Sequence, residues 1–462
     1  MAKAGEKNKT GEFISEVSGS VLGAISFDKS LYDEYGVKRG LRNADGTGVM
    51  AGITGIGNVR GYFIRDGERV PAPGELTYRG IDINELCDGF LKDGRLGYEE
   101  TAYLLLFGKL PSKAELQTFC ERIAELRVLP EGFTEDMILA APSLNIMNKL
   151  SRSFLALYSY DDAPETYGGD VKDELEKALC LTARAPIIIA NAFAAKRHYY
   201  DKGSLHIRRP EPSLSTAENL LRIVRRTGKF TDDEARLLDL CLVIHAEHGG
   251  GNNSTFACRV LSSSGTDIYS ALSAAVGSLK GALHGGANER VLAMFDDIEA
   301  NVENPNDDGE VRDYLLKIVR GEAGLRDGKI YGMGHAVYTL SDPRALILKN
   351  TARKLAEKSE FIGKFNLIET VERLTPGVLA ETGKRTKPIC ANVDMYSGMV
   401  YKMLGIPREL YTPLFAVARV PGWCAHRIEE LWSNGRIIRP AYKAIAKEQR
   451  YVPIDERQES EQ

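Results

Sequence analysis

Apolar residues recur at helical spacing through most of the chain from about Tyr98 onward, and several of these segments begin at recognisable caps. Ser112 is followed three positions later by Glu115, and Thr231 is followed at the same spacing by Glu234. In such a capping box each side chain bonds the backbone N–H of the other residue, which stabilises a helix N-terminus. The pattern predicts a mainly α fold.

Three of the predicted helices have distinctive compositions. The segment from Leu237 to Ile244 is apolar nearly all the way round, which is typical of a buried helix. The segment from Asp267 to Leu283 consists largely of Ala, Ser and Gly, which fits a tight helix–helix or subunit contact and equally an ordinary core helix. The segment that begins at Asp173 is expected to be interrupted at Pro186, because proline lacks the N–H that a continuous helix needs.

The first eighty residues differ from this pattern, because they are glycine-rich and carry the β-type runs "GVMAGITGIG", "RGYFIRDG" and "ELTYRGIDI". These runs predict small strands and turns rather than long helices. Residues 287–391 are helical but more charged, and are expected to form a small domain. A large domain is then expected from residues 1–286 and 392–462, the latter including the C-terminal tail, since 462 residues exceed what one core usually serves.

Composition narrows the function classes. The net charge of −4, with 43% hydrophobic and 27% charged residues, is typical of a soluble globular protein without a basic field for nucleic acid or an anionic membrane. No uninterrupted apolar run approaches the ~20 residues that span a bilayer, and the N-terminal segment lacks the apolar core of a signal peptide. A cytoplasmic location is therefore expected. The seven cysteines are widely spaced, without a C-x-x-C pair, which indicates free thiols.

Two histidines occur where the apolar segment ends in "IHAEHGG". His245 and His248 are three residues apart, so both can lie on one helix face. The helix macrodipole favours a cation near a C-terminus, which explains them without a ligand. The alternative is a zinc hydrolase, which needs a third ligand, and no H-E-x-x-H motif is present. We expect no metal.

A third histidine, His284, stands among glycines and alanines in "GALHGGANE", in a turn before what the pattern predicts as a new helix from Ala287. A helix N-terminus disfavours the protonated ring, so a neutral His284 could donate through one N–H. Such a donor can polarise a carbonyl or an enolate oxygen near neutral pH. The alternative is a histidine that merely caps the turn.

The segment "GMGHAVYTLSDPRALIL" combines a glycine turn, His335 and a helix start with Ser341 as the expected N-cap. Arg344 falls in the first turn of that helix, where a cation opposes the dipole. A bound carboxylate or phosphate, held by Arg344 and the helix N-terminus together, would reconcile the two. The alternative is an ion pair between Arg344 and Asp342.

Charged residues also interrupt three apolar C-terminal segments. In "ICANVDMYSG", Asn392 is a plausible N-cap, and Asp394 is a candidate base only if it points into a shared cleft. Arg419 stands among apolar residues in "FAVARVPGW", and Arg439 precedes a proline in "RIIRPAY". An arginine in such surroundings either extends toward solvent or meets a dedicated anion.

Together these segments resemble the citrate synthase family, including the related 2-methylcitrate synthases. The resemblance rests on "HAEHGGGNNS", "GALHGGANE", "GMGHAVYTLSDPRA", "NVDMYSG", "FAVARVPGW" and "RIIRPAY", and covers about residues 40 to 445. It implies a mainly α fold in which a smaller domain closes over a cleft in the large one. It also implies a homodimer, and no metal or redox cofactor.

The resemblance assigns roles to the residues singled out above. The implied catalytic residues are His284, His335 and Asp394. The implied oxaloacetate-binding residues are His248, Arg344, Arg419 and Arg439, the last completing the neighbouring subunit's site. The implied coenzyme A (CoA) contacts are Gly332, Met333, Gly334 and Lys387. Two positions depart from many relatives: Ala336 replaces an arginine, and Pro421 could alter the aim of Arg419.

The implied reaction condenses acetyl-CoA with oxaloacetate and hydrolyses the citryl-CoA thioester to citrate and CoA, a step of the tricarboxylic acid cycle. In this scheme Asp394 removes a methyl proton, His284 stabilises the enolate and His335 polarises the carbonyl under attack. The alternative within the family is a 2-methylcitrate synthase that uses propionyl-CoA, which is larger by one methylene. An inactive helical scaffold is a further alternative, which the intact catalytic trio argues against.

Overall fold

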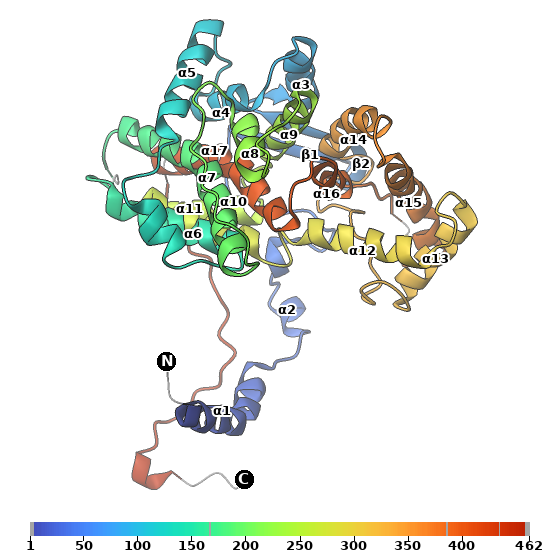
Figure 1. Cartoon of the computed structure of the whole chain (residues 1–462). Helices are drawn as coiled ribbons and strands as arrows, with labels where there is room; N and C mark the ends of the chain where they lie inside the picture. Colours follow the sequence, from blue (N-terminus) through green and yellow to red (C-terminus); the bar gives the residue numbers. More distant parts are fainter. Residues whose placement is uncertain (1–3, 166–167, 385–386, 434, 458–462) are drawn as a thin grey trace. The chain divides into compact units, whose positions relative to one another are not determined.

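The computed structural model describes residues 4–165, 168–384, 387–433 and 435–457, and it is mainly α, as the sequence predicted (Figure 1). The chain divides into two compact units. One comprises Met1–Met50 and Arg439–Gln462, and the other comprises Ala51–Ile438. Every candidate site residue except Arg439 belongs to the second unit. The expected division into domains 1–286, 287–391 and 392–462 stays a prediction.

The second unit is a bundle of helices preceded by a small sheet. Its helices are α3 (Ile83–Lys92), α4 (Tyr98–Phe107), α5 (Lys113–Leu126), α6 (Ile146–Leu157), α7 (Val171–Tyr199), α8 (Thr216–Val224), α9 (Asp232–His245), α10 (Asn253–Ser262), α11 (Ile268–Lys280), α12 (Ala287–Asn301), α13 (Asp308–Arg320), α14 (Pro343–Ala356), α15 (Ile362–Glu381), α16 (Asp394–Met403) and α17 (Tyr411–Trp432). Both predicted capping boxes are present, at the starts of α5 and α9.

The sheet is an antiparallel meander of β1 (Gly57–Arg65), β2 (Glu68–Tyr78) and β3 (Ile81–Asp82). These strands coincide with two of the three β-type runs in the sequence. The third run, residues 48–57, holds only an isolated bridge from Gly48 to Arg42 and the first residue of β1, so its expected strand is wrong. Its glycines leave few side chains to pack on a pleated surface.

The first unit contradicts the expectation of strands and turns at the N-terminus. It begins with the long helix α1 (Ala4–Ile25), followed by α2 (Leu31–Glu34) and the short turn η1 (Arg39–Leu41). Ile14, Val21 and Ile25 recur at helical rather than alternating spacing, and they are exposed within this unit. The β-type runs that suggested strands begin only after α1, although α1 itself contains four glycines.

Helix α7 crosses the core of the second unit and is not interrupted at Pro186, which lies inside it. The helix packs against α5, α6, α8 and α17, so tertiary packing compensates for the hydrogen bond that proline cannot make. By length and composition α7 could span a membrane, with a mean hydropathy of 1.6, but 78% of that stretch is buried inside the fold. The core helix of a soluble protein has the same character.

Helix α17 lies against α7, α9, α10 and α11. Its middle is buried on every side, from Ala416 to Arg427, and it stays helical through Pro421. Two arginines, Arg419 and Arg427, are carried on this helix with no exposed surface. Burial of a guanidinium is costly unless an opposite charge or a ligand compensates it, so the partners of these two residues are informative.

Candidate active site

The end of α9 and the turn after it bring two neutral histidines into the core. The Nδ1 of His245 lies 2.6 Å from the carbonyl oxygen of Cys241, and its ring packs edge-on against Phe415. Burial lowers the pKa of His245 to about 3. The His248 pKa is likewise far below its usual range, because the ring is buried and Arg344 lies near it. The Nε2 of His248 has no partner among the described residues.

These two histidines do not form a metal centre with other described side chains. The described part of the chain contains no group of three His, Cys, Asp or Glu residues placed to hold an ion. The zinc alternative therefore lacks its third ligand there. The seven cysteines are free thiols, five of them buried.

His335 packs against His248, with 5.1 Å between ring centroids, and stacks on Tyr338 at 4.6 Å. Its Nδ1 accepts the backbone N–H groups of Val337 at 3.1 Å and Tyr338 at 3.2 Å. A ring nitrogen that accepts carries no proton, so the neutral imidazole holds its proton on Nε2. His335 can therefore donate a hydrogen bond to a ligand from Nε2.

The glycine turn before His335 ties it to the segment that precedes α16. Gly332 and Gly334 have φ of +84° and +90°, which L side chains rarely adopt. The N–H of Gly334 donates to Cys390 at 2.8 Å, and the N–H of Asn392 donates to Gly332 at 2.8 Å. The side chain of Asn392 also donates to the Gly334 carbonyl. This pairing fixes His335 relative to the start of α16.

Asp394 is the first residue of α16. Its N–H donates to the Asn392 side chain at 3.0 Å. The N-cap of α16 is Val393, one residue after the expected Asn392. Burial raises the pKa of Asp394 to about 6, although Arg344 acts in the opposite direction. The carboxylate is therefore mostly ionised at neutral pH, and its basicity exceeds that of an ordinary aspartate.

Arg344 is buried at the start of α14 and forms the ion pair that sequence reasoning kept as the alternative. Its Nε and Nη2 donate to the Asp342 carboxylate at 3.0 Å and 2.7 Å. Asp342 is also the N-cap of α14, so the expected cap Ser341 is wrong; the Ser341 hydroxyl instead accepts the N–H of Gly74. Asp342 Oδ2 further accepts the N–H of Val393, beside Asp394. The protein's own carboxylate thus offsets the conflict with the helix dipole.

Arg419 lacks such a partner. Its Nε donates to the carbonyl oxygen of His245 at 2.6 Å and its guanidinium lies over the Phe415 ring, but Nη1 and Nη2 are buried with no partner among the described residues. Burial lowers its pKa to about 10, while Glu247 acts to raise it. Arg419 is therefore a cation at neutral pH with unsatisfied donors, and Pro421 has not moved it away from the histidines of α9.

Sequence reasoning gave no role to Glu247, the acid that most strongly raises the pKa of Arg419. Glu247 is fully buried after the end of α9, between His245 and His248, and accepts from His426 Nε2 at 3.0 Å. His426 Nδ1 faces Arg259 Nη1 at 2.8 Å, and Arg259 in turn pairs with Glu429 at 2.8 Å and Glu430 at 3.0 Å. Burial alone would raise the pKa of Glu247, but His426 and Arg419 lower it below its usual value. The signal in the sequence was an acid inside a buried apolar segment.

His284 lies in the turn between α11 and α12. A side chain on Gly285 would overlap the carbonyl oxygen of Leu279, which explains the glycine. The Nε2 of His284 is 3.2 Å from the Ser254 hydroxyl. Its pKa is lowered to about 4, first by burial and then by Arg419. The ring is neutral as predicted, but burial rather than a helix N-terminus is the main cause.

The structure thus brings six of the predicted residues into one set linked by contact or charge. His248, His335, Arg344 and Asp394 share direct or electrostatic contacts, and Arg419 joins them to His284. Gly332, Met333 and Gly334 form the turn before His335, and their backbone pairs with residues 390–392. Lys387 is exposed in the segment between α15 and α16, and Arg439 is exposed in the other unit. Their roles stay predictions.

Comparison with known proteins shows which family the chain belongs to. The family described as "Citrate synthase, C-terminal domain" matches residues 45–441. The chain belongs to the citrate synthase family. It is 36% identical to the citrate synthase of Haloferax volcanii over 83% of this chain and 93% of that protein. It is 37% identical to the Synechocystis enzyme over 83% and 88% of the two chains.

Solved structures agree with this membership. The citrate synthase of Thermotoga maritima is 30% identical, with a TM-score of 0.71 over 89% of this chain and 98% of that one. The Thermoplasma acidophilum citrate synthase, solved in a ternary complex with carboxymethyl coenzyme A and oxaloacetate, is 28% identical, with a TM-score of 0.72 over 88% and 97% of the chains. The protein is therefore an acyltransferase of the citrate synthase family.

Proposed function

We propose that this enzyme condenses acetyl-CoA with oxaloacetate and hydrolyses the resulting thioester to citrate and CoA. The observation that carries the proposal is the buried Arg419 guanidinium, whose Nη1 and Nη2 lack partners among the described residues beside two neutral histidines. A small dianion would compensate this charge and accept both donors. Oxaloacetate is such a dianion, and the Thermoplasma relative was solved with it bound.

The pKa shifts of Asp394 and His284 support this reaction. Asp394, with its pKa raised to about 6, is ionised at neutral pH and can take a proton from the acetyl methyl group. Neutral His284 donates to the thioester oxygen as the enolate forms, because a protonated ring would not persist in this buried position. His335 donates from Nε2 to the oxaloacetate carbonyl and then protonates the alkoxide produced by carbon–carbon bond formation.

The final step is hydrolysis of the citryl thioester, in which water adds to the carbonyl carbon and the CoA thiolate departs with a proton. Water must be absent earlier, because bulk water would reprotonate the enolate before it attacked the carbonyl. The proposal invokes no metal or redox cofactor, and it places the enzyme in the cytoplasm. Gly332, Met333, Gly334 and Lys387 are proposed to contact CoA.

The direct test is release of CoA thiol from acetyl-CoA with and without oxaloacetate. We expect release only when oxaloacetate is present, and a loss of kcat by at least ~10³ in Asp394→Asn, because general-base catalysis contributes on this order. Asp313→Asn, which removes an exposed carboxylate, should keep normal turnover. Near-normal turnover in Asp394→Asn would show that another group is the base. Propionyl-CoA is the second acyl substrate to compare, since one methylene alters discrimination by only ~1–3 kcal/mol.

We further propose a homodimer in which Arg439 completes the partner's site. Asp394→Asn and Arg439→Gln should each be inactive alone. After the two variants are mixed, unfolded and refolded together, about a quarter of normal activity should return, because half the dimers are mixed and hold one intact site each. No recovery in a mixture that forms dimers would contradict the shared site.

A further inference from the structure

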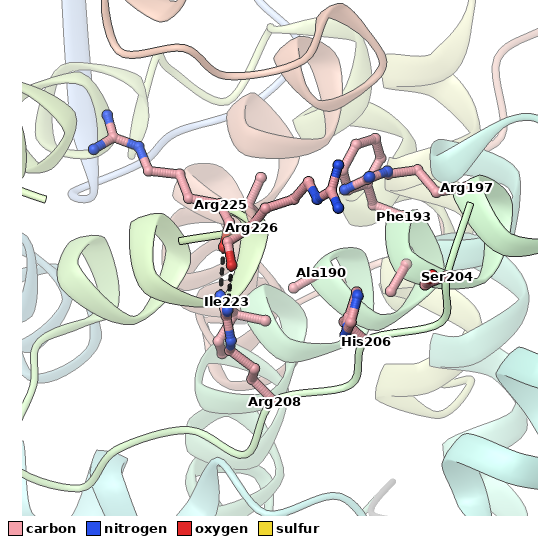
Figure 2. A pocket seen from close by; sticks show the side chains of 11 residues that line it. Ala190, Phe193, Arg197, Ser204, His206, Arg208, Ile223, Arg225 and Arg226 are labelled. Atoms are coloured by element: carbon pink, nitrogen blue, oxygen red, sulfur yellow. Dashed lines mark hydrogen bonds between the residues drawn. The ribbon is translucent and has the colours of Figure 1, made fainter. Parts of the chain in front are cut away.

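A second basic site lies at the end of α7, away from the residues described above. A hollow opens between the last turns of α7, the segment around residues 204–208 and the end of α8 (Figure 2). Its polar lining consists of Arg197, Ser204, His206, Arg208, Arg225 and Arg226. Four arginines line the hollow, and no acidic side chain among the lining residues neutralises their positive charge.

Two of the four arginines have structural partners. Arg208 donates to the backbone carbonyl oxygens of Arg222 at 2.8 Å, Arg225 and Arg226, which closes the end of α8. Arg225 points away from the hollow in Figure 2 and pairs with Glu234 through both terminal nitrogens, at 2.9 Å and 2.6 Å. These two side chains explain the local fold and need no ligand.

The other two arginines extend toward each other from opposite sides of the hollow (Figure 2). Arg197 comes from the last turn of α7 and Arg226 from the loop after α8. Neither guanidinium has an ion-pair or hydrogen-bond partner among the described residues; Arg197 lies only near the Phe193 ring. The α7 dipole favours a cation at the position of Arg197, but it does not explain a second cation facing it. Two guanidinium groups that extend toward each other repel, and an anion bound between them would turn this repulsion into attraction.

We propose that this hollow binds a small oxyanion of the phosphate class. A phosphate group offers several oxygens to two guanidinium forks at once, which is the geometry that arginine recognises best. The Ser204 hydroxyl and the His206 ring line the same hollow and supply two further donors. The apolar floor of Ala190 and Ile223 limits the depth, so the ligand is inorganic phosphate or the phosphoryl group of a small phosphomonoester. The proposal does not depend on the proposed reaction.

The test measures binding of inorganic phosphate and of methyl phosphate to the full chain by calorimetry, with chloride at matched ionic strength as the reference. The Arg197→Gln/Arg226→Gln double variant should weaken phosphate binding at least about tenfold, because hydrogen bonds between charged groups are roughly twice as strong as neutral ones. Arg209→Gln is the matched control. Arg209 is exposed and does not line the hollow, so the same change of charge there should leave binding within about twofold.

The two phosphate sources give distinct supporting results. Tighter binding of methyl phosphate indicates a phosphomonoester, and tighter binding of phosphate indicates the free ion. Equal affinity of the double variant and the wild-type chain would overturn the proposal, because any binding would then lie elsewhere. Absence of phosphate binding, together with dissociation of an oligomer in the double variant, would also overturn it and assign the arginines to a subunit contact.

Discussion

Two arginines on the same helix have opposite surroundings. Arg427 and Arg419 are both fully buried in α17, two turns apart. Arg427 pairs with the buried Glu174, its Nε lying 2.5 Å from Oε1, and also reaches Ser262. Arg419 has one backbone acceptor and two nitrogens with no partner among the described residues. Burial alone therefore does not distinguish a structural arginine from a binding one; the unused donors do.

The difference also separates stability from function. Breaking a buried ion pair that contains an arginine is destabilising. The intact pair itself adds little net stability, because desolvation of the two charges offsets much of their attraction. A buried arginine without an ion-pair partner lowers the free energy of unfolding until a ligand binds to it, as expected of a preorganised site. Arg344 is intermediate, since Asp342 occupies two of its donors while Arg344 still acts electrostatically on His248 and Asp394.

The largest predicted effect tests the difference between Arg427 and Arg419. Arg427→Met should lower the free energy of unfolding by about 3–5 kcal/mol, because it leaves the Glu174 carboxylate buried without its partner. Arg419→Met should leave stability unchanged or higher, while oxaloacetate-dependent turnover is lost. Chemical denaturation and steady-state kinetics of the two variants measure both quantities.

The double variant Arg427→Met/Glu174→Met is the control for that experiment. Replacing both members of a buried ion pair by apolar side chains is often neutral, so most of the lost stability should return. If Arg419→Met proved as destabilising as Arg427→Met, the distinction between the two arginines would be wrong.

The pH dependence tests the state of Asp394. Because its pKa is raised to about 6, kcat/KM should fall about tenfold per pH unit below about pH 6, as the base becomes protonated. The sign for stability follows from linkage: the folded chain keeps this proton to a higher pH than the unfolded chain, so its contribution is full only below the usual aspartate pKa of 3.8 and is lost as pH rises from there through 6. Asp394→Asn should therefore gain stability relative to wild type between pH 4 and 8, by at most about 2–3 kcal/mol. A constant difference across that range would refute the raised pKa.

Glu247 gives a smaller effect on the same site. Glu247→Gln should lower the free energy of unfolding by about 1–3 kcal/mol, because Arg419 loses its nearby anion and His426 keeps only a neutral acceptor. Oxaloacetate should then raise Tm more in the variant than in wild type, since the ligand replaces the missing negative charge. A purely structural glutamate would leave the ligand-induced shift in Tm unchanged. Thermal unfolding with and without oxaloacetate separates the two.

Sequence reasoning anticipated the helical fold and named six residues that the structure links, but it left the partner of Arg344 open and gave no role to Glu247. Periodicity and capping identify helices locally, so the capping boxes at Ser112 and Thr231 were predicted correctly. The choice of Asp342 over Ser341 as cap depends on Arg344 and Val393, which meet only in the folded chain. Continuity of α7 through Pro186 depends on packing against other helices. Tertiary contacts of this kind leave no local pattern to read.

The smallest predicted effects compare two glycines near His284. Gly285→Ala should lower kcat at least about tenfold and cost about 1–3 kcal/mol of stability, because its Cβ would overlap the Leu279 carbonyl and displace the His284 turn. Gly277, inside α11, has open space where a Cβ would stand, so Gly277→Ala should stabilise the helix by up to about 1 kcal/mol and leave kcat unchanged. Kinetics and chemical denaturation of both variants measure this contrast. Equal effects at the two positions would mean that the glycines beside His284 serve only the fold, and that the close approach of the turn to α11 does not position the ring.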